Sequence, residues 1–304
     1  MLLFSLIDGF LLDCKSRNLS QRTIELYDSI LHEFCTFLDN PQSDSITTND
    51  LRRFVVHSQE RSRFSVGNHP FKKPDGVKLT AWAIHRYVRV LKTFFTWAVR
   101  EEILSNNPAT KLKKPQLPKD EIKAFSEDEV KTLLEVARAQ SYRDYAIVLL
   151  LLDSGLRKKE LVDLVLDDIN LLTGIITIRH GKGNKSRQVC VGKVCRKVLW
   201  LYVNEHRKPR NETEKAFFLN SKGQALNYFT LGTIMTRLSK KCNFKVYAHK
   251  CRHTFATNLA KKTGNAFLLA QVLGHSDLET SKGYIHLAQG DIQSLSSPMD
   301  ELLK

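Results

Sequence analysis

Near the C-terminal end of the chain, two histidines and an arginine lie within five residues of one another. The stretch reads HKCRHTF and contains His249, Arg252 and His253. Two histidines four residues apart could bind zinc from one helix, but a zinc protease has glutamate directly after the first histidine, and Lys250 stands there instead. A basic surface and a cradle for an anion are the other two interpretations. Cations and imidazoles this close together favour the anion.

The charge of the whole chain favours a polyanionic partner. The 304 residues carry a formal net charge of +15. Residues 1–50 have a net charge of −5, whereas 51–120 and 121–304 have +10 each. Lysines and arginines that contact phosphates release counterions, so an excess of this size favours nucleic acid. A basic protein without such a partner is the alternative on charge alone.

The cysteines and the N-terminus predict a cytoplasmic protein with no membrane partner. The six cysteines show no CxxC spacing, which favours buried thiols over a disulfide framework or a zinc ribbon. The apolar N-terminus lacks a basic start and is broken by Asp8 and Asp13, which favours an amphipathic helix over a signal peptide. No run reaches the roughly 18 apolar residues that a membrane span needs.

Helical periodicity dominates residues 1–110. Apolar residues recur at helical spacing up to Leu38, and Ser20 is expected to cap the second helix. Thr48 or Asn49 is expected to cap the third. A polar loop follows, and then a long helix pattern. We therefore predict a small all-helical domain over these residues.

The long helix is predicted over 79–102, with Trp82 among the residues on its apolar side. Cations three residues apart lie on one flank of it, where they could meet a ligand together. They are Arg86, Arg89 and Lys92.

A change in composition after this helix predicts a domain boundary. Residues 106–125 contain three prolines and five lysines, which is typical of an extended segment rather than a packed element. We predict a basic linker over 111–123 and a second domain over 124–304. Lysines of this linker are candidate ligand contacts: Lys111, Lys113 and Lys114.

The second domain is predicted to be mainly helical with a small sheet. Ser126 and Glu129 have the spacing of a capping box, and an apolar helix is expected to end at Gly155. Two short β-like runs joined by a turn rich in glycine and lysine predict a hairpin over 175–191. A short strand is expected over 216–220. Further helices are expected over 192–206, 228–242, 249–263, 266–275 and 277–288.

Four segments of the second domain resemble the motif boxes of the tyrosine recombinases, the family of phage integrases and Xer-type enzymes. In chain order they read SGLRKKEL, GKGNKSRQVCV, HKCRHTFATNL and LGHSDLETSKGYIH. The order matches the family pattern, and so does the spacing of nine residues from the histidine of LGH to the tyrosine. The first domain resembles the helical core-binding domain of these enzymes, with a run into the linker, so the resemblance covers nearly the whole chain in an Xer-like layout.

The resemblance implies the fold and the site. The fold would be mainly α with a small β-sheet: a SAM-like helical core-binding domain followed by an α+β catalytic domain. Glu160 would orient the site from outside it, and His253 is expected to pack and hydrogen-bond rather than react. Lys182 is favoured over Lys185 as the lysine of the hairpin. The residues around a scissile phosphodiester would be Arg157, Lys182, His249, Arg252 and His275, with Tyr284 as the nucleophile.

The implied chemistry is strand cleavage and rejoining through a 3′-phosphotyrosyl bond, without a metal ion or another cofactor. Two guanidiniums offer permanently charged donors to the non-bridging oxygens of the transition state. Lys182 suits the acid that protonates the leaving 5′-oxygen. His249 suits the acceptor of the tyrosine proton, because a phenol with a pKa of ~10 needs such help near neutral pH. His275 would hydrogen-bond the phosphate.

The resemblance further implies duplex DNA with a specific recombination site as the partner, bound by a tetramer built of two dimers. An accessory protein is a further candidate partner. The amphipathic C-terminal tail could complete its own core or dock on a neighbouring protomer. Two other functions stay open: a DNA-binding accessory protein that has lost the reaction, and a relaxing enzyme like the type IB topoisomerases. The first of these is disfavoured by four intact residues, which are Arg157, Lys182, Arg252 and Tyr284.

Overall fold

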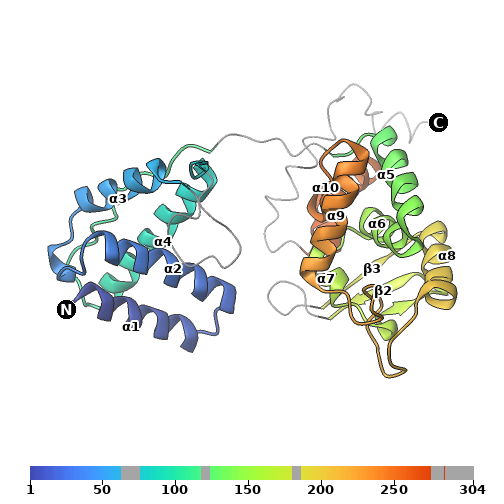
Figure 1. Cartoon of the computed structure of the whole chain (residues 1–304), viewed down its shortest axis with the longest axis horizontal. Coiled ribbons are helices and arrows are strands. Elements are labelled where there is room, and N and C mark those ends of the chain that lie inside the picture. The colour runs from blue at the N-terminus through green and yellow to red at the C-terminus, as the bar shows by residue number, and fades with distance from the viewer. Residues whose placement is uncertain (63–75, 118–123, 180–185, 275–283, 285–304) are drawn as a thin grey trace, which may run out of the picture. The chain divides into compact units, whose positions relative to one another are not determined.

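The computed structural model describes residues 1–62, 76–117, 124–179, 186–274 and 284 of the chain. It divides into two compact units, Met1–Asp120 and Glu121–Lys304, and each is described here by itself. Helices make up the first unit, and helices with a small sheet make up the second (Figure 1). The predicted fold class is thereby confirmed. Among the described residues, no helix is long and apolar enough to cross a membrane.

Unit 1 contains four α-helices among its described residues, and side chains cap three of them. Ser20 accepts a hydrogen bond from the backbone of Thr23, as predicted. Thr47 caps the third helix in a capping box with Asp50, so the prediction of Thr48 or Asn49 was one or two residues late. Thr80 caps the fourth. The elements are α1 (Leu3–Ser16), α2 (Gln21–Phe37), the short 3₁₀ turn η1 (Ser43–Ser45), α3 (Thr48–Glu60) and α4 (Ala81–Arg100).

The core of unit 1 is largely aromatic. Helix α4 packs against α1, α2 and α3 and places Phe94 and Phe95 at the centre, where both are fully buried. The ring of Phe94 lies 5.5 Å from that of Phe10, in the edge-to-face arrangement that aromatic quadrupoles favour. Trp82 is 52% exposed, so its predicted place on the apolar side of α4 was wrong. It lies in the first turn of the helix, beyond the reach of the core.

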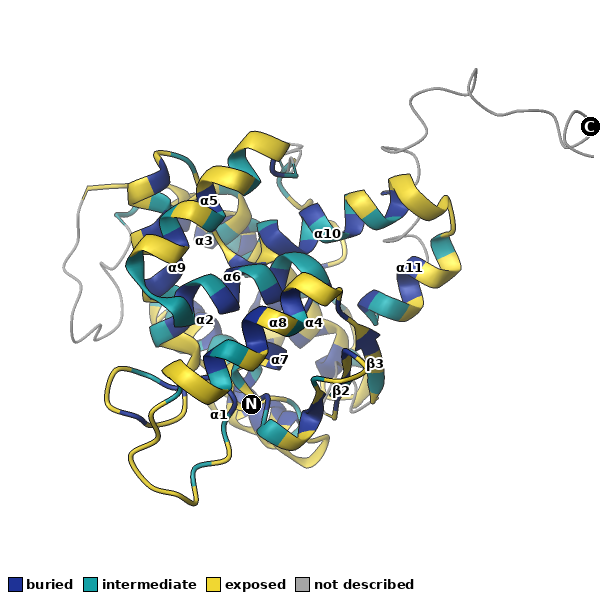
Figure 2. Ribbon diagram, turned by 90° about the vertical axis from the view of Figure 1, so that its right-hand side faces the viewer, coloured by how far each residue is buried: buried dark blue, intermediate teal, exposed yellow. Residues whose placement is uncertain are grey.

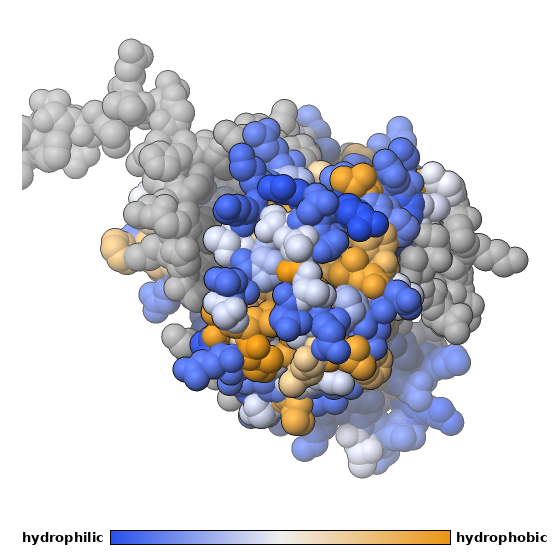
Figure 3. Space-filling view, turned by 90° about the vertical axis from the view of Figure 1, so that its left-hand side faces the viewer, coloured by the Kyte–Doolittle hydropathy of each residue, from blue (hydrophilic) through white to orange (hydrophobic). Residues whose placement is uncertain are grey.

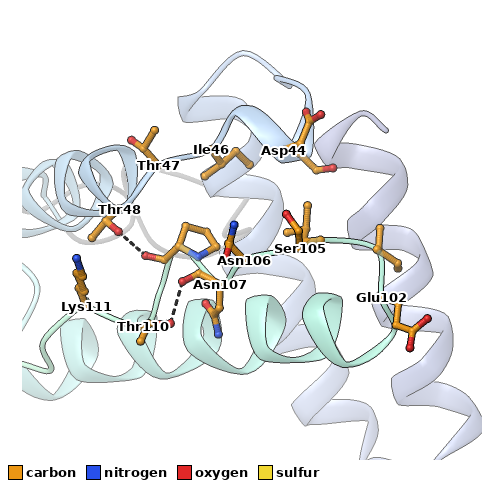
Figure 4. Close-up of a pocket in the computed structure, with 14 residues that line it drawn as sticks. Asp44, Ile46, Thr47, Thr48, Glu102, Ser105, Asn106, Asn107, Thr110 and Lys111 are labelled. Atoms are coloured by element: carbon orange, nitrogen blue, oxygen red, sulfur yellow. Dashed lines mark hydrogen bonds between the residues drawn. The ribbon is translucent and has the colours of Figure 1, made fainter.

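The chain after α4 folds back on unit 1 before it leaves. Thr48 donates a hydrogen bond of 2.8 Å from its hydroxyl to the carbonyl of Pro108, which holds this segment against the start of α3 (Figure 4). Ala109 and Leu112 are buried in the core, so the packed part of the unit reaches into the segment predicted to be extended. A polar hollow of about 840 Å³ lies between this segment and the 3₁₀ turn, with Lys111 at its edge.

Unit 2 is built around helix α6, which has an unbroken apolar run from Ala146 to Leu152. This helix packs against α5, α8 and α10, and Gly155 ends it in the left-handed conformation, as predicted. The predicted capping box of Ser126 and Glu129 is present on α5. Buried and exposed residues alternate along α10 and α11 (Figure 2). The helices are α5 (Glu127–Gln140), α6 (Tyr142–Ser154), α7 (Lys158–Val162), α8 (Lys193–Leu201), α9 (Tyr228–Cys242), α10 (Ala248–Thr263) and α11 (Ala266–Leu273), with a 3₁₀ turn η2 (Leu166–Asp168) and a π-helical turn η3 (Tyr202–His206).

The sheet of unit 2 has three antiparallel strands in the order β1 (Ile169–Asn170), β2 (Ile175–Ile178) and β3 (Arg187–Cys190). Ile176 pairs with Val189, and both point into the core. The predicted hairpin is therefore confirmed, whereas its turn lies outside the described residues. The strand predicted over 216–220 was wrong, because only isolated bridges form at Ala216 and Leu219. The two-residue strand β1 was missed, since two residues carry no readable periodicity.

Candidate active site

Helix α10 carries the stretch HKCRHTF into the interior of unit 2. Arg252 is only 3% exposed, and its Nη1 donates a hydrogen bond of 2.7 Å to the carbonyl of Gly155. Gly155 has a φ of +62°, and a Cβ at this position would collide with the ring of Phe255 on α10. The glycine thus ends α6, allows α10 to pack closely and offers a carbonyl to the buried guanidinium.

Arg157 reaches the same cluster from the start of α7. Its backbone N–H and its Nη1 both donate to the carboxylate of Glu160, over 2.7 and 2.8 Å. Its Nη2 donates to the carbonyl of Gly274 over 2.8 Å. Arg252 donates from Nη2 to the neighbouring carbonyl, that of Leu273, over 2.6 Å. The end of α11 therefore holds together two arginines that lie far apart in the sequence.

Arg187 belongs to this cluster and was missed by the sequence analysis. It begins β3, and its Nη1 and Nη2 each donate to one oxygen of Glu160 over 2.7 Å. A signal was available: Arg187 and the buried Val189 are two residues apart on the same face of the strand, so a cation was to be expected on the inner side.

The charges of the cluster shift the pKa values of its members. Burial raises the pKa of Glu160, but hydrogen bonds and charge from Arg187 and Arg157 outweigh it and hold the pKa at about 2. Burial lowers the pKa of Arg252 to about 10, with a further lowering from Arg157. The described part of the cluster holds three guanidiniums and one carboxylate, so it carries a positive charge that a phosphate group could balance.

Tyr284 packs against the cluster from the C-terminal side. It is 9% exposed and contacts a small apolar group of α10 and α11 that includes Ala256 and Leu269. Its hydroxyl makes a short hydrogen bond with Nδ1 of His253. The ring of His249 lies 4.4 Å from that of His253, edge to face. The two imidazoles thus form a row that ends at the tyrosine hydroxyl.

Burial, with a smaller contribution from the charges nearby, keeps these imidazoles neutral. Burial, then His249 and Arg252, lower the pKa of His253 to about 4. Partial desolvation, followed by the charges of Arg252 and Arg157, lowers the pKa of His249, although part of its side chain is exposed at the surface. Burial raises the pKa of Tyr284, and Arg252 partly opposes that rise. In the protein without DNA the tyrosine is therefore a neutral phenol.

Comparison with known proteins decides the family. The profile described as "Phage integrase family" matches residues 123–290, and the profile "Phage integrase, N-terminal SAM-like domain" matches residues 7–102. The chain belongs to the phage integrase family. A tyrosine recombinase XerC from Alcanivorax borkumensis is 32% identical over 294 residues, which cover 93% of this chain and 88% of the relative. A tyrosine recombinase XerD from Listeria innocua is 29% identical over 93% of this chain and 94% of its own.

Solved structures agree with this assignment at the level of the fold. The Tn1549 transposon integrase in complex with a circular intermediate DNA superposes with a TM-score of 0.78 at 17% identity, covering 97% of this chain and 99% of the integrase. The family profiles and the Xer relatives confirm the sequence-based predictions of a tyrosine recombinase, of an Xer-like layout and of site-specific DNA recombination.

The structure places the remaining predicted residues of the recombinase as follows. Lys182 and His275 lie outside the described residues, although Gly274 directly precedes His275 in the chain. Arg86, Arg89, Lys111, Lys113 and Lys114 are exposed on unit 1. Within the described part of the chain, no group of three or more His, Cys, Asp or Glu side chains could hold a metal ion.

One hollow on unit 1 gathers several of these cations. It measures about 350 Å³ and is lined by Arg89, Lys92 and Lys114, together with Arg17 and Arg100, which the sequence analysis did not single out. The last two pair with Asp13 and Glu101. Trp97 and Phe10 contribute to its floor. The cations predicted from the flank of α4 and from the linker thus meet at one place.

A second basic groove lies on unit 2, along the outer face of α9. It measures about 660 Å³ and is lined by Lys158, Arg237, Lys240 and Lys241, with the exposed ring of Phe229. The Nζ of Lys158 lies 3.7 Å from the ring centre of Tyr228, a cation–π contact that fixes the lysine at the edge of the groove.

Proposed function

We propose that Tyr284 is the nucleophile of the recombination reaction. Its oxygen attacks the phosphorus of the scissile phosphodiester, the bond to the 5′-oxygen breaks, and a 3′-phosphotyrosyl bond forms. The phenol proton passes to an imidazole, and Lys182 protonates the leaving 5′-oxygen. Attack by a 5′-hydroxyl on the phosphotyrosyl bond reverses these steps and rejoins the strand. The observation that carries the proposal is the hydrogen bond between the hydroxyl of Tyr284 and His253 on α10. His253 directly follows the buried Arg252 in the chain.

Arg157 and Arg252 stabilise the charge on the non-bridging oxygens. A guanidinium has five N–H groups, and the hydrogen bonds described above use two from each side chain. The protein bonds fix the plane of each guanidinium, and the other N–H groups are available for phosphate. Donors fixed in advance need no reorganisation in the transition state, and removing one typically costs roughly 3–4 kcal/mol.

The two histidines of α10 divide the handling of the proton. His253 holds the hydroxyl of Tyr284 in the DNA-free protein, but with a pKa of about 4 it is a weak base. His249 is the proposed acceptor when DNA is bound, as the sequence resemblance implies. A bound phosphate offsets the charges of Arg157 and Arg252, which lower the pKa of His249, so the imidazole becomes a stronger base when the substrate arrives. His275 donates a hydrogen bond to the phosphate.

The basic hollow on unit 1 and the groove along α9 bind the phosphate backbone of the duplex. Arg86, Arg89 and Lys92 contact the DNA from α4, and Lys111, Lys113 and Lys114 contact it from the segment that follows. Phosphate contacts of this kind set the affinity and its dependence on salt, whereas a few base contacts select the site.

The active assembly is a tetramer of two dimers on two DNA sites, in the cytoplasm, with an accessory protein as a further partner. Apolar side chains of α1 stay exposed in the single chain, including Phe4 and Leu12 at 47% and 67%. The face of unit 1 in Figure 3 shows apolar patches bordered by hydrophilic side chains. Apolar patches bordered by polar side chains suit contact between protomers.

Capture of the covalent intermediate tests the proposal. DNA fragments bound by the protein are selected from its own genome, and the bound site is rebuilt as a nicked duplex that traps the intermediate. We expect a protein–DNA adduct on denaturing gels that Tyr284→Phe abolishes while DNA binding persists. An adduct that survives Tyr284→Phe would reject the nucleophile. Tight binding without an adduct would indicate an accessory protein, and relaxation of any supercoiled plasmid would indicate a topoisomerase.

A further inference from the structure

Three consecutive carbonyls at the end of α11 accept hydrogen bonds from three different arginines. Val272 accepts from Nε of Arg187 over 2.9 Å, and the next two carbonyls accept from Arg252 and Arg157. The last carbonyls of a helix have no partner within it, and this end of the helix carries a partial negative charge. The C-terminus of α11 thus holds the three guanidiniums side by side.

Glu160 holds two of the same arginines from the other side. Its carboxylate accepts two hydrogen bonds from Arg187 and two from Arg157, two at each oxygen. Only 4% of the Glu160 side chain and 10% of the Arg187 side chain are exposed. Gly274 leaves room for this arrangement, because a Cβ there would lie 3.2 Å from Cδ and Nη1 of Arg187.

We propose that Arg187 is a positioning residue of the recombination reaction: it holds Glu160 and the end of α11 so that Arg157 presents its other N–H groups to the scissile phosphate. This inference rests on the proposed role of Arg157. Arg187 acts on the catalytic arginines through two shared partners. One is the carboxylate of Glu160, which also binds Arg157, and the other is the end of α11, which binds all three arginines.

Electrostatics explains why a second arginine on Glu160 matters. The guanidinium of Arg187 binds both oxygens of the Glu160 carboxylate. Arg157 therefore donates only one guanidinium hydrogen bond to Glu160 and does not form a bidentate pair with it. Without Arg187, Glu160 would draw the guanidinium of Arg157 into such a pair, and fewer N–H groups would face the phosphate. Loss of Arg187 would therefore slow the chemical step and leave DNA affinity nearly unchanged.

Adduct formation on the nicked duplex, measured in single turnover, tests this role. We expect Arg187→Met to slow it by roughly 10- to 100-fold, the range typical of residues that orient catalytic groups. DNA affinity in gel shifts should stay within about threefold, since Arg187 is buried away from the solvent-exposed cations. Arg187→Lys should recover part of the rate, because it restores the charge but not the fork.

Arg179 provides the matched control on the same hairpin. It directly follows β2 and pairs with Asp168 through Nε at 2.5 Å, and its side chain is 56% exposed. Arg179→Met should leave the rate within about threefold of the wild type, because this guanidinium pairs with Asp168 rather than with Glu160. An equal loss of rate in both variants would mean that the hairpin needs cations in general, and would overturn the assignment to Arg187.

A double-mutant cycle separates positioning from a general loss of structure. If Arg187 acts through Glu160, the variant with Arg187→Met and Glu160→Gln should be no slower than the slower single variant, whereas independent losses would multiply. Wild-type rates in a folded Arg187→Met, or multiplied losses, would overturn the proposal. If Arg187→Met does not fold, Arg187→Lys decides, with a wild-type rate counting against the proposal. Absence of an adduct in the wild type would instead reject the proposed function.

Discussion

Each unit of the protein buries arginine with glutamate, but the two groups differ in their balance of charge. In unit 1, Arg61 pairs with Glu33, and both contact the hydroxyl of Tyr87. This group carries no net charge. Burial and Glu33 raise the pKa of Tyr87 well above its ordinary value, so the hydroxyl stays neutral.

In unit 2, Arg157 and Arg187 pair with Glu160, and Arg252 lies close by at the same end of α11. Among the described residues, this group carries two more positive charges than negative ones. A buried excess of charge costs stability unless something compensates for it. Over the described residues of unit 1, the corresponding group is balanced in charge and joins α2, the end of α3 and α4. The unbalanced group of unit 2 becomes complete only with an anion. Net charge, rather than burial alone, therefore distinguishes a structural group of ion pairs from a substrate site.

Removal of the two glutamates tests this distinction most strongly. Glu160→Gln and Glu33→Gln each leave buried arginine without its carboxylate, and we expect each to destabilise its own unit by about 3–5 kcal/mol. Phosphate should restore much of the stability lost in Glu160→Gln, because its negative charge compensates the uncompensated arginines of unit 2 when it binds to Arg157 and Arg252, but not that lost in Glu33→Gln. Hydrogen exchange, which reports on each unit separately, measures both effects. Equal rescue of the two variants by phosphate would remove the distinction.

Removal of one arginine from each group should separate catalysis from folding. Arg252→Gln takes away a phosphate donor, so we expect adduct formation to slow by roughly 10²- to 10³-fold. Arg61→Gln should destabilise unit 1 without changing the rate of adduct formation in the bound complex. Single-turnover kinetics at saturating protein measures the rate, and denaturant unfolding measures the stability. A large fall in the bound rate for Arg61→Gln would show that unit 1 contributes to the chemical step.

Only part of the unbalanced group of unit 2 could be predicted from the sequence. Arg157 and Arg252 stand in recognisable motifs, and the cap of Glu160 on Arg157 follows from their spacing of three residues. The contact between Arg187 and Glu160 joins residues 27 positions apart through the fold of the sheet against α7. No local pattern specifies such a contact.

The hydrogen bond between Tyr284 and His253 could not be predicted from the sequence for a related reason. His249 and His253 both lie on the first turns of α10, and the sequence resemblance favoured the first as the partner of the tyrosine. Which imidazole meets the hydroxyl depends on the direction from which Tyr284 approaches α10, and that direction is set by packing against Ala256 and Leu269. The fold of unit 1 was easier to predict, because its long amphipathic helices carry a strong periodic signal, whereas the exposed Trp82 shows that periodicity fails in a terminal turn.

The pH dependence of stability should also differ between the groups. His253 has a pKa of about 4 in the folded protein against 6.5 as its ordinary value, so the unfolded chain binds the proton more readily. Stability is therefore lost as the pH falls from 6.5 towards 4, by at most about 3 kcal/mol. Glu160, with a pKa of about 2, contributes its full stabilisation above its ordinary value of 4.5 and loses it only as the pH falls from 4.5 towards 2.

Unfolding measured between pH 4.5 and 6.5 isolates the histidine. We expect His253→Gln to flatten the slope in this window relative to the wild type. The amides of unit 2 should carry the change in hydrogen exchange, and those around Glu33 and Tyr87 should not. An unchanged slope would mean that His253 is no less basic in the folded protein than in the unfolded chain, and the cations of the cluster would then not act on it as described.

The smallest effect concerns charges that are not buried at all. Arg89 lines the basic hollow of unit 1, and Lys131 is an exposed lysine of unit 2 paired with Asp128. If the hollow binds the DNA backbone, Arg89→Ala should weaken binding severalfold for every sequence and reduce the slope of log affinity against log salt by about 1. Lys131→Ala, as the control, should leave that slope unchanged. Neither variant should alter the rate of adduct formation once DNA is saturating, because solvent-exposed cations bind the backbone without touching the phosphate that reacts. A lower saturating rate in Arg89→Ala would instead mean that contacts on unit 1 are transmitted to the arginines around Glu160.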